Sequence, residues 1–401
     1  MALTLSRRLD HLGDGPFTRV QALTAGLAPA AGLRPVDLSL GEPHHAFPAA
    51  VARTIAEREA EWGRYPPLRG SLELRSAIVR WLGRRYGLAE VGIDPERQVL
   101  ALSGSREGLF LIAQVAVADP LSRTGRPPLV LLPNPFYAAY AGAAAGAGAE
   151  PVFVPATAAT GYLPDYAALP ADVLDRAALC FLCSPSNPQG AAASAAYLET
   201  LIGLARTHDF VLAVDECYAE LYDASPPPGA LEVCAAIGDG GCENVVVFHS
   251  LSKRSSVPGL RSAFVCGDAQ VIAAFARLRA YSAATAPGPV LAASAALWDD
   301  DAHVAATRDH YRARFDQAER ILDGRFGFRR PDGAFFLWLD VGDGEAAARR
   351  LWTERALKVM PGAYLSQGIG GDNPGHGFIR VALVEDADGT EDILARIART
   401  L

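Results

Sequence analysis

The sequence predicts an α/β fold, in which a large domain built on a mostly parallel, doubly wound sheet is joined to a smaller α+β domain. Short apolar runs alternate with helical stretches between about residues 46 and 290, which is typical of parallel sheets covered by helices on both faces. Polar, glycine and proline residues follow these runs directly, at the edge where such sheets bind ligands. After about residue 290 longer helical segments dominate.

Seven apolar runs in the large domain, residues 46–290, are predicted strands. They lie at residues 99–102, 129–132, 151–154, 179–183, 210–214, 245–248 and 263–266. Helical stretches between several of them lie at residues 107–117, 136–146 and 195–208. The runs are apolar throughout, as strands covered on both faces must be.

The two ends of the chain are predicted to form the smaller domain together. Residues 1–45 are an arm with a helical pattern at 17–27, and residues 291–401 form the body of the domain. Its predicted elements are an amphipathic helical region at 290–322, segments at 335–340 and 358–361, a helix near 345–355, a strand at 378–384 and a helix at 388–401.

Composition and charge narrow the possible classes of function. Half of the residues are hydrophobic and a fifth are charged, the balance of an ordinary globular protein. The net charge of −8 gives no reason to expect nucleic acid or an anionic membrane as a partner. The N-terminus has no signal-peptide pattern, and no apolar run reaches the ~20 residues of a membrane span.

Six scattered cysteines indicate a reduced protein. Cys180-x-x-Cys183 looks like half of a metal or redox motif, but it lies inside an apolar run and no second pair follows at zinc spacing. A buried strand is the better interpretation because free cysteine is commonly buried. We therefore expect no metal site and a cytoplasmic location.

The strongest chemical signal is Ser250-Leu-Ser252-Lys253, which follows a predicted strand, with Arg261 eight residues beyond Lys253. A lysine amine can form a Schiff base when partial burial lowers its pKa. The two serines and the arginine could bind a phosphate, the arginine bidentately. The alternative is a basic surface loop, since short motifs match by chance.

Further candidate groups follow the first two predicted strands of this series. Gly104, Ser105 and Arg106 open a helix, whose free N–H groups could bind a phosphate, although a simple N-cap is an equally good interpretation. Tyr137 follows Pro133-Asn-Pro-Phe. It could stack on a planar cofactor or simply pack at the start of a helix.

Two later strands are followed by groups suited to a pyridine ring. Asn187 lies in a proline-rich turn, and Asp215 ends an apolar strand three residues before Tyr218. A carboxylate there needs a charged partner. A pyridinium N–H would supply one, and the aspartate would keep the ring protonated as an electron sink. Tyr218 could donate to the ring hydroxyl.

The order of these residues resembles that of fold-type I, class I/II pyridoxal-phosphate aminotransferases over nearly the whole chain. The matching series is Asn187, Asp215-x-x-Tyr218, Ser250-x-Ser252-Lys253, Arg261 and Arg380. Tyr65-Pro-Pro-Leu-Arg-Gly70 matches the family segment whose tyrosine reaches the phosphate in the neighbouring subunit. Arg380 matches the arginine that binds the substrate α-carboxylate, and its position on an apolar strand by itself calls for an anionic partner.

The resemblance implies roles for all of these residues. The catalytic set is Lys253, Asp215 and Tyr137. The implied pyridoxal 5′-phosphate contacts are Gly104, Ser105, Arg106, Tyr137, Asn187, Asp215, Tyr218, Ser250, Ser252, Lys253, Arg261 and Tyr65. The implied substrate contacts are Gly41, Asn187 and Arg380. The reaction would be a ping-pong transamination in a homodimer with shared sites, with Lys253 as Schiff-base lysine and then general base.

More closely, the chain resembles bacterial succinyldiaminopimelate aminotransferases. The supporting stretches are residues 34–43, 103–107, 133–137, 215–218 and 250–256, of which Lys253-Arg-Ser is the most diagnostic. This resemblance implies glutamate as donor and N-succinyl-2-amino-6-oxopimelate as acceptor, in lysine synthesis. Gln189 replaces the usual threonine, and the small residues at 281–289 leave open whether Ser282 or Thr285 reaches the partner's phosphate.

Several alternatives remain at this stage. Arg34, Arg106 and Arg254 are candidates for binding the distal carboxylates of a long substrate, and each could instead be a structural pair. The acceptor could be that of an alanine, aromatic or LL-diaminopimelate aminotransferase. The scaffold could also serve a lyase, because fold does not fix reaction. A non-catalytic cofactor-binding regulator is disfavoured, because Lys253 and Asp215 are both present.

Overall fold

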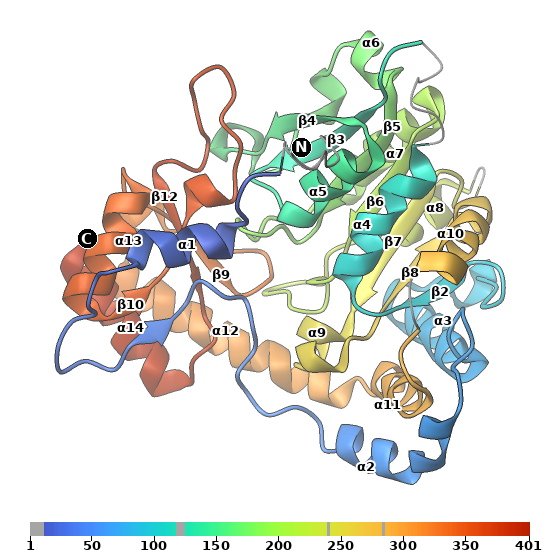
Figure 1. Ribbon diagram of the computed structural model, residues 1–401, viewed down its shortest axis with the longest axis horizontal. Coiled ribbons are helices and arrows are strands. Elements are labelled where there is room, and N and C mark those ends of the chain that lie inside the picture. The colour runs from blue at the N-terminus through green and yellow to red at the C-terminus, as the bar shows by residue number, and fades with distance from the viewer. Residues whose placement is uncertain (1–11, 118–124, 239–240, 283–284) are drawn as a thin grey trace, which may run out of the picture.

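The computed structural model describes residues 12–117, 125–238, 241–282 and 285–401. Figure 1 shows a larger domain and a smaller one, with the long helix α12 (Ala302–Leu322) running between them and the N-terminal arm lying along the smaller domain. In the described part of the chain, no helix has both the length and the apolar character needed to cross a membrane.

A seven-stranded sheet forms the centre of the larger domain, in the order β2-β8-β7-β6-β5-β3-β4. The strands are β2 (Val99–Leu102), β3 (Leu129–Asn134), β4 (Glu150–Pro155), β5 (Ala177–Cys183), β6 (Val211–Asp215), β7 (Val245–Ser250) and β8 (Ala263–Gly267). Strand β8 runs antiparallel to its neighbours β7 and β2, and the other pairs are parallel. All seven predicted strands are confirmed, including the buried β5 that contains Cys180 and Cys183.

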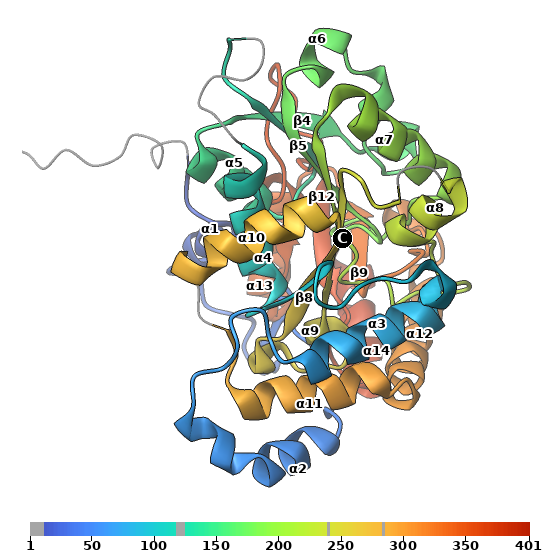
Figure 2. The same cartoon turned by 90° about the vertical axis from the view of Figure 1, so that its right-hand side faces the viewer.

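Helices cover both faces of this sheet, as the uniformly apolar strands require. One core lies beneath α3 (Leu72–Tyr86), α7 (Ala195–His208), α8 (Ala230–Ile237) and α11 (Gly288–Asp299). The other lies beneath α4 (Ser105–Ala116), α5 (Ala138–Ala147) and α10 (Ala269–Ser282). Figure 2 shows these two sets of helices on opposite sides of the sheet. The shorter helices are α2 (Ala50–Glu57), α6 (Ala171–Leu174) and α9 (Leu251–Arg254).

The smaller domain contains a three-stranded antiparallel sheet in the order β11-β12-β9. Its elements are β9 (Phe336–Asp340), α13 (Gly344–Arg355), β11 (Met360–Pro361), β12 (Phe378–Ala382) and α14 (Ala387–Thr400). The arm contributes α1 (Pro16–Thr24), which contacts α13, and β1 (Val36–Asp37), which pairs in parallel with β10 (Leu357–Lys358).

The helical region predicted at 290–322 is confirmed, and it consists of two helices, α11 and α12. The chain breaks at Asp300, whose side chain accepts a hydrogen bond from Ala302 N at 2.9 Å. Such local bonds let aspartate compete with helix propagation. The predicted domain limit at residue 290 falls inside α11, which packs on α2 and α3, and the limits themselves stay predictions.

Candidate active site

The candidate site lies where the parallel strands of the large sheet end. Because β2, β3, β5, β6 and β7 are parallel, their carboxyl ends share one edge, and the antiparallel β8 begins there. This topology brings together the segments that contain Gly104, Tyr137, Asn187, Asp215, Lys253 and Arg261.

Lys253 lies in α9, directly after β7. The hydroxyl of Ser250 caps this helix by accepting a hydrogen bond from Ser252 N at 3.1 Å. The Lys253 Nζ donates to the carbonyl of Gly41 in the arm and lies 5.6 Å from the centre of the Phe335 ring. Burial, reinforced by nearby arginine charges, lowers the pKa of Lys253 to about 8. A substantial fraction of the amine is therefore neutral and nucleophilic in mildly alkaline solution.

Asp215 ends β6 as a buried carboxylate. Its Oδ2 accepts a hydrogen bond from the Tyr140 hydroxyl at 2.7 Å, and its Oδ1 accepts one from Cys217 N at 3.2 Å. Burial raises the pKa of Asp215, and these two donors oppose the shift. A buried carboxylate that has only neutral donors is well suited to a protonated ring nitrogen.

Tyr140 is a site residue that the sequence reasoning missed. It lies in α5 with no exposed surface, and its ring stacks on Phe181 at 4.5 Å between ring centres. It follows Tyr137 by three residues, a spacing that places two side chains on the same face of a helix. That spacing is the signal that could have identified it.

The start of α4 forms a narrow recess beside Arg261. Gly104 has φ +96°, and a Cβ atom built there would lie 2.0 Å from Arg261 Nη2. The same nitrogen donates to the carbonyl of Ser103 at 3.3 Å. Nearby, the Ser250 and Ser252 hydroxyls are 3.0 Å apart. Only glycine fits at position 104, because both its backbone conformation and the available space exclude a side chain.

Arg106, in the first turn of α4, lies beside Tyr137. Its Nε donates to the Tyr137 hydroxyl at 2.6 Å, and its guanidinium lies 5.7 Å from the ring centre. Burial raises the pKa of Tyr137, while the Arg106 charge opposes that shift. Ser105 precedes Arg106 and hydrogen bonds to the Cys217 side chain, next to Asp215. Arg106 itself remains exposed at the rim.

Arg380 brings a buried cation to the opposite side of the cleft. It lies in β12 with 3% of its surface exposed. Its Nη1 donates to Asn187 Oδ1 at 2.9 Å, its Nη2 donates to the carbonyl of Ser39, and its Nε has no partner in the part of the chain that the structure describes. Among the described residues no carboxylate pairs with it, and burial lowers the pKa of Arg380 to about 10. Such a site favours an anionic ligand.

Aromatic rings line the space between Lys253 and Arg380. The ring of Phe336 lies 4.4 Å from the Arg380 guanidinium carbon. Tyr218 is buried, with its ring 5.9 Å from Phe335 and 5.7 Å from Phe336. A Cβ atom on Gly41 would lie 2.6 Å from Phe336, so glycine allows the arm to approach Lys253 closely.

Two of the three candidate distal arginines are engaged elsewhere. Arg254 is buried and donates to the Leu297 carbonyl and to Asp301 Oδ1, both at 2.7 Å. It therefore holds α9 to the α11–α12 junction. Arg34 pairs with Glu385 in the smaller domain. Arg106 is the candidate whose terminal nitrogens remain without a protein partner in the described part of the chain.

Tyr65 lies outside the cleft of its own protomer. Its side chain is fully exposed, between α2 and α3. Thr285 donates its hydroxyl to the carbonyl of Leu68 at 3.0 Å, so it adjoins the same loop. Ser282 donates to the carbonyl of Leu278 at the end of α10.

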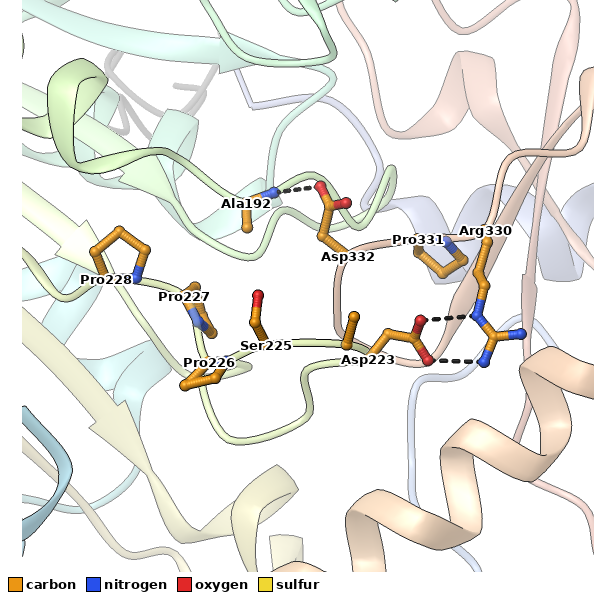
Figure 3. Close-up of a pocket in the computed structure, with 10 residues that line it drawn as sticks. Ala192, Asp223, Ser225, Pro226, Pro227, Pro228, Arg330, Pro331 and Asp332 are labelled. Carbon is orange, nitrogen blue, oxygen red and sulfur yellow. Dashed lines mark hydrogen bonds and ion pairs between the residues drawn. The ribbon is translucent and has the colours of Figure 1, made fainter.

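A separate pocket of about 280 Å³ lies at the junction of the two domains, lined in part by Pro226 and Pro227 (Figure 3). Arg330 in its wall is paired with Asp223 through two contacts of 2.8 Å. Asp332 accepts a hydrogen bond from Ala192 N at 3.0 Å. None of the predicted site residues lines this pocket, and its charged groups are already paired.

Comparisons with known proteins agree with this geometry. The chain is 33% identical over 404 residues to an LL-diaminopimelate aminotransferase of Nitratidesulfovibrio vulgaris, with 98% of each chain covered. A crystal structure of an aminotransferase from Neisseria meningitidis superposes with a TM-score of 0.92 at 36% identity, covering 98% of this chain and 99% of that one. A probable N-succinyldiaminopimelate aminotransferase from Thermus thermophilus gives a TM-score of 0.83 at 28% identity, covering 96% and 100%.

The family assignment rests on nearly the full length of the chain. The model of the family described as aminotransferase class I and II matches residues 34–399. That range includes the larger domain, the smaller domain except for α1 and the last residues of the chain, and every residue of the cleft described above. The chain therefore belongs to the class I and II aminotransferases, whose cofactor is pyridoxal phosphate.

Proposed function

We propose that this chain transfers an amino group from glutamate to N-succinyl-2-amino-6-oxopimelate, in the synthesis of diaminopimelate and lysine. The observation that carries the transfer is that Lys253, with its lowered pKa, and Arg380, a buried cation without a carboxylate partner among the described residues, lie beside two adjacent aromatic rings, those of Phe335 and Phe336. An amino acid has an amine that can react at Lys253 and a carboxylate that can bind Arg380. The resemblance of residues 250–256 to succinyldiaminopimelate aminotransferases supports the acceptor.

The residues of the cleft fit pyridoxal phosphate. The recess at Gly104, Arg261 and Ser250 suits the phosphate, because it combines a helix N-terminus with a guanidinium. The buried carboxylate of Asp215 suits the ring nitrogen. When bound, the cofactor supplies a protonated aromatic ring that withdraws electrons from the amino-bearing carbon.

The remaining contacts would orient the ring and the reacting groups. Tyr137 would stack on the ring, and Asn187 and Tyr218 would bind its oxygen. Lys253 Nζ would take a proton from the substrate α-carbon and pass it to the cofactor, which requires the neutral amine that the lowered pKa supplies. Arg380 would bind the α-carboxylate bidentately and so fix which hydrogen faces Lys253.

Arg106 is the proposed cation for the distal carboxylate. It lies exposed at the rim beside Tyr137, whereas Arg34 and Arg254 are paired with acidic residues. Its bond to the Tyr137 hydroxyl uses Nε alone and leaves the terminal nitrogens for a second anion. A substrate whose far end is a carboxylate is therefore favoured over a small apolar amino acid.

A second candidate is LL-diaminopimelate itself as the amino-group product or donor. The observation in its favour is the similarity of the chain to LL-diaminopimelate aminotransferases, at 33% and 32% identity. The two candidates differ at the distal end, where one substrate has a succinylated nitrogen and the other has a free ammonium. That difference makes them separable by experiment.

We also propose a homodimer in which Tyr65 completes the phosphate site of the other protomer. Large apolar or aromatic side chains are exposed around this loop, and they are those of Trp62, Tyr65, Leu68, Leu72 and Tyr281. A cluster of this kind is typical of an interface rather than of a solvent-exposed surface. Two-fold pairing is the commonest closed assembly.

We place the protein in the cytoplasm. All six cysteines lie in the described part of the chain and are free thiols, five of them buried. Unpaired cysteines are the norm in reducing compartments, where disulfides are rare.

The test is the visible absorbance of the purified holoprotein. Addition of L-glutamate should convert the absorbance band of the lysine-bound cofactor to that of its amino form. N-succinyldiaminopimelate and LL-diaminopimelate should then be compared as amino donors at equal concentration. Faster conversion by the succinylated donor supports the first proposal, and faster conversion by the free amine supports the second. No conversion by any of the three would overturn both.

A further inference from the structure

One hydrogen-bonded link between the two domains involves a residue to which the proposed reaction gives no role. Asn134 is the last residue of β3 and has no exposed surface. Its Nδ2 donates to the carbonyl of Gln367 at 2.9 Å, and its Oδ1 accepts from Gln367 N at 3.0 Å. Phe136 N donates to the carbonyl of Leu365 at 2.8 Å. The nitrogen and the oxygen of the Asn134 amide group are thus both paired with the main chain of one residue, Gln367, in the smaller domain.

Gln367 belongs to a loop, residues 362–376, that is internally braced. Ser366 donates its hydroxyl to the carbonyl of Gly362 at 2.8 Å, and Gly375 N donates to Asn373 Oδ1 at 2.9 Å. A Cβ atom on Gly375 would lie 2.2 Å from the Gly362 carbonyl oxygen, so the two limbs of the loop pack directly together. Such a loop transmits a displacement rather than absorbing it.

The braced loop connects the two strands that position the buried cation of the cleft. It leaves β11 after Pro361 and enters β12 at Phe378. Across this pair Met360 lies opposite Arg380. On the other domain, Asn134 and Tyr137 lie three residues apart. The Asn134 link therefore joins the wall that contains Tyr137 to the strand that contains Arg380.

A different link joins the domains on the side of the pocket in Figure 3. There Asp332 N donates to the carbonyl of Gly190 at 2.9 Å, and Asp332 accepts from Ala192 N. A third link between the domains is the hydrogen bond that Arg380 donates to Asn187. In the described part of the chain, the hydrogen bonds that hold loop 362–376 to the large sheet are those of Asn134 and Phe136.

We propose that Asn134 is a positioning residue for the amino-acid substrate. By holding loop 362–376 against β3, it fixes the separation between Arg380 in the smaller domain and Lys253 in the larger one. A single amino acid must span that separation, with its carboxylate at Arg380 and its amine near Lys253. Misplacement by a fraction of an ångström weakens both contacts together. The inference relies on the proposed binding of the α-carboxylate by Arg380, but not on the identity of the acceptor.

The first test compares Asn134→Leu, which keeps the side-chain size but forms neither bond, with Gln367→Ala as a matched control. Gln367 contributes its main chain to the link while its side chain is exposed, so the control should behave as wild type. Loss of two buried hydrogen bonds should raise KM for glutamate about tenfold, with a smaller change in kcat. The absorbance maximum and the cofactor affinity should stay unchanged, because Asp215 and Lys253 are not affected.

A second readout does not depend on the reaction. Thermolysin digestion of the cofactor-free protein at the exposed Ile369 should be about tenfold faster in Asn134→Leu than in wild type or Gln367→Ala. If wild type does not react with glutamate, the proposed function fails, while this cleavage still decides whether the link exists. If Asn134→Leu shows the same cleavage rate and the same KM for glutamate as wild type, the inference is overturned.

Asn134→Asp provides a test that does not depend on how well the leucine variant folds. Its carboxylate can accept from Gln367 N but opposes the Gln367 carbonyl, whereas its protonated form can donate to that carbonyl. Because position 134 has no exposed surface, burial should raise the pKa of this carboxyl, and cleavage relative to Gln367→Ala should slow as the pH falls toward that raised pKa. The inference is also overturned if the cleavage rate of Asn134→Asp, divided by that of Gln367→Ala, is independent of pH and equal to the same ratio for wild type.

Discussion

Replacing Tyr140 with phenylalanine should make the stability of the cofactor-free protein depend more strongly on pH. The variant keeps the ring that stacks on Phe181 and removes the hydroxyl that donates to Asp215 at 2.7 Å. Asp215 then keeps Cys217, whose backbone N–H donates at 3.2 Å and whose side chain also lowers the pKa of Asp215. The pKa of Asp215, already raised by burial, should rise further.

The expected loss of stability follows from the charge of the Asp215 carboxylate, which accepts the hydrogen bond. A hydrogen bond to a charged group contributes about 1.5–3 kcal/mol, so removal of this donor should raise the pKa of Asp215 further. The folded state binds this proton more tightly than the unfolded state does. The charge of Asp215 therefore lowers stability fully above the folded pKa, and this penalty shrinks as the pH falls below the folded pKa and disappears below the unfolded pKa. The variant should lose about 2 kcal/mol at pH 8 and less at lower pH.

The assay is urea unfolding of the cofactor-free protein at a series of pH values, with Tyr166→Phe as the control. Tyr166 is equally buried, and its hydroxyl donates to a neutral group, the carbonyl of Phe181, at 2.6 Å. Its loss should cost about 1 kcal/mol at every pH. If Tyr140→Phe shows the same loss as this control at all pH values, the Tyr140 hydroxyl does not stabilise a charged Asp215 and the reasoning is wrong.

Three further predictions concern the cofactor. On mixing cofactor-free protein with pyridoxal phosphate, the visible band should appear faster as the pH rises through about 8, where Lys253 loses its proton, and Lys253→Ala should form no band. Gly104→Ala should weaken cofactor binding about a hundredfold by displacing Arg261, whereas Gly203→Ala, in open space on α7, should not. Tyr65→Phe should weaken cofactor binding at least about tenfold although Tyr65 is fully exposed in its own protomer, and unchanged affinity would exclude a shared site.

The large sheet was predictable from sequence because its strands are short, apolar and evenly separated by helices. Each of the seven strands lies within about two residues of its predicted position. The helical character of residues 290–322 was predictable as well, but the division of this region into two helices was not, because its apolar pattern continues across Asp300. There the side chain of Asp300 and the pairing of Asp301 with Arg254 decide the outcome, and neither contact is visible in a hydrophobic pattern.

By itself the sequence determined which strand ends lie together at one edge of the large sheet. Asp215 and Lys253 are convincing candidates because they follow apolar strands, and parallel strands must end at one edge. Only the tertiary structure decided their surroundings. The Tyr140 hydroxyl on Asp215, the engagement of Arg254 and the Asn134 link to Gln367 join segments that are 75, 47 and 233 residues apart. Such contacts depend on how helices and loops pack against the sheet, and no local pattern in the chain encodes that packing.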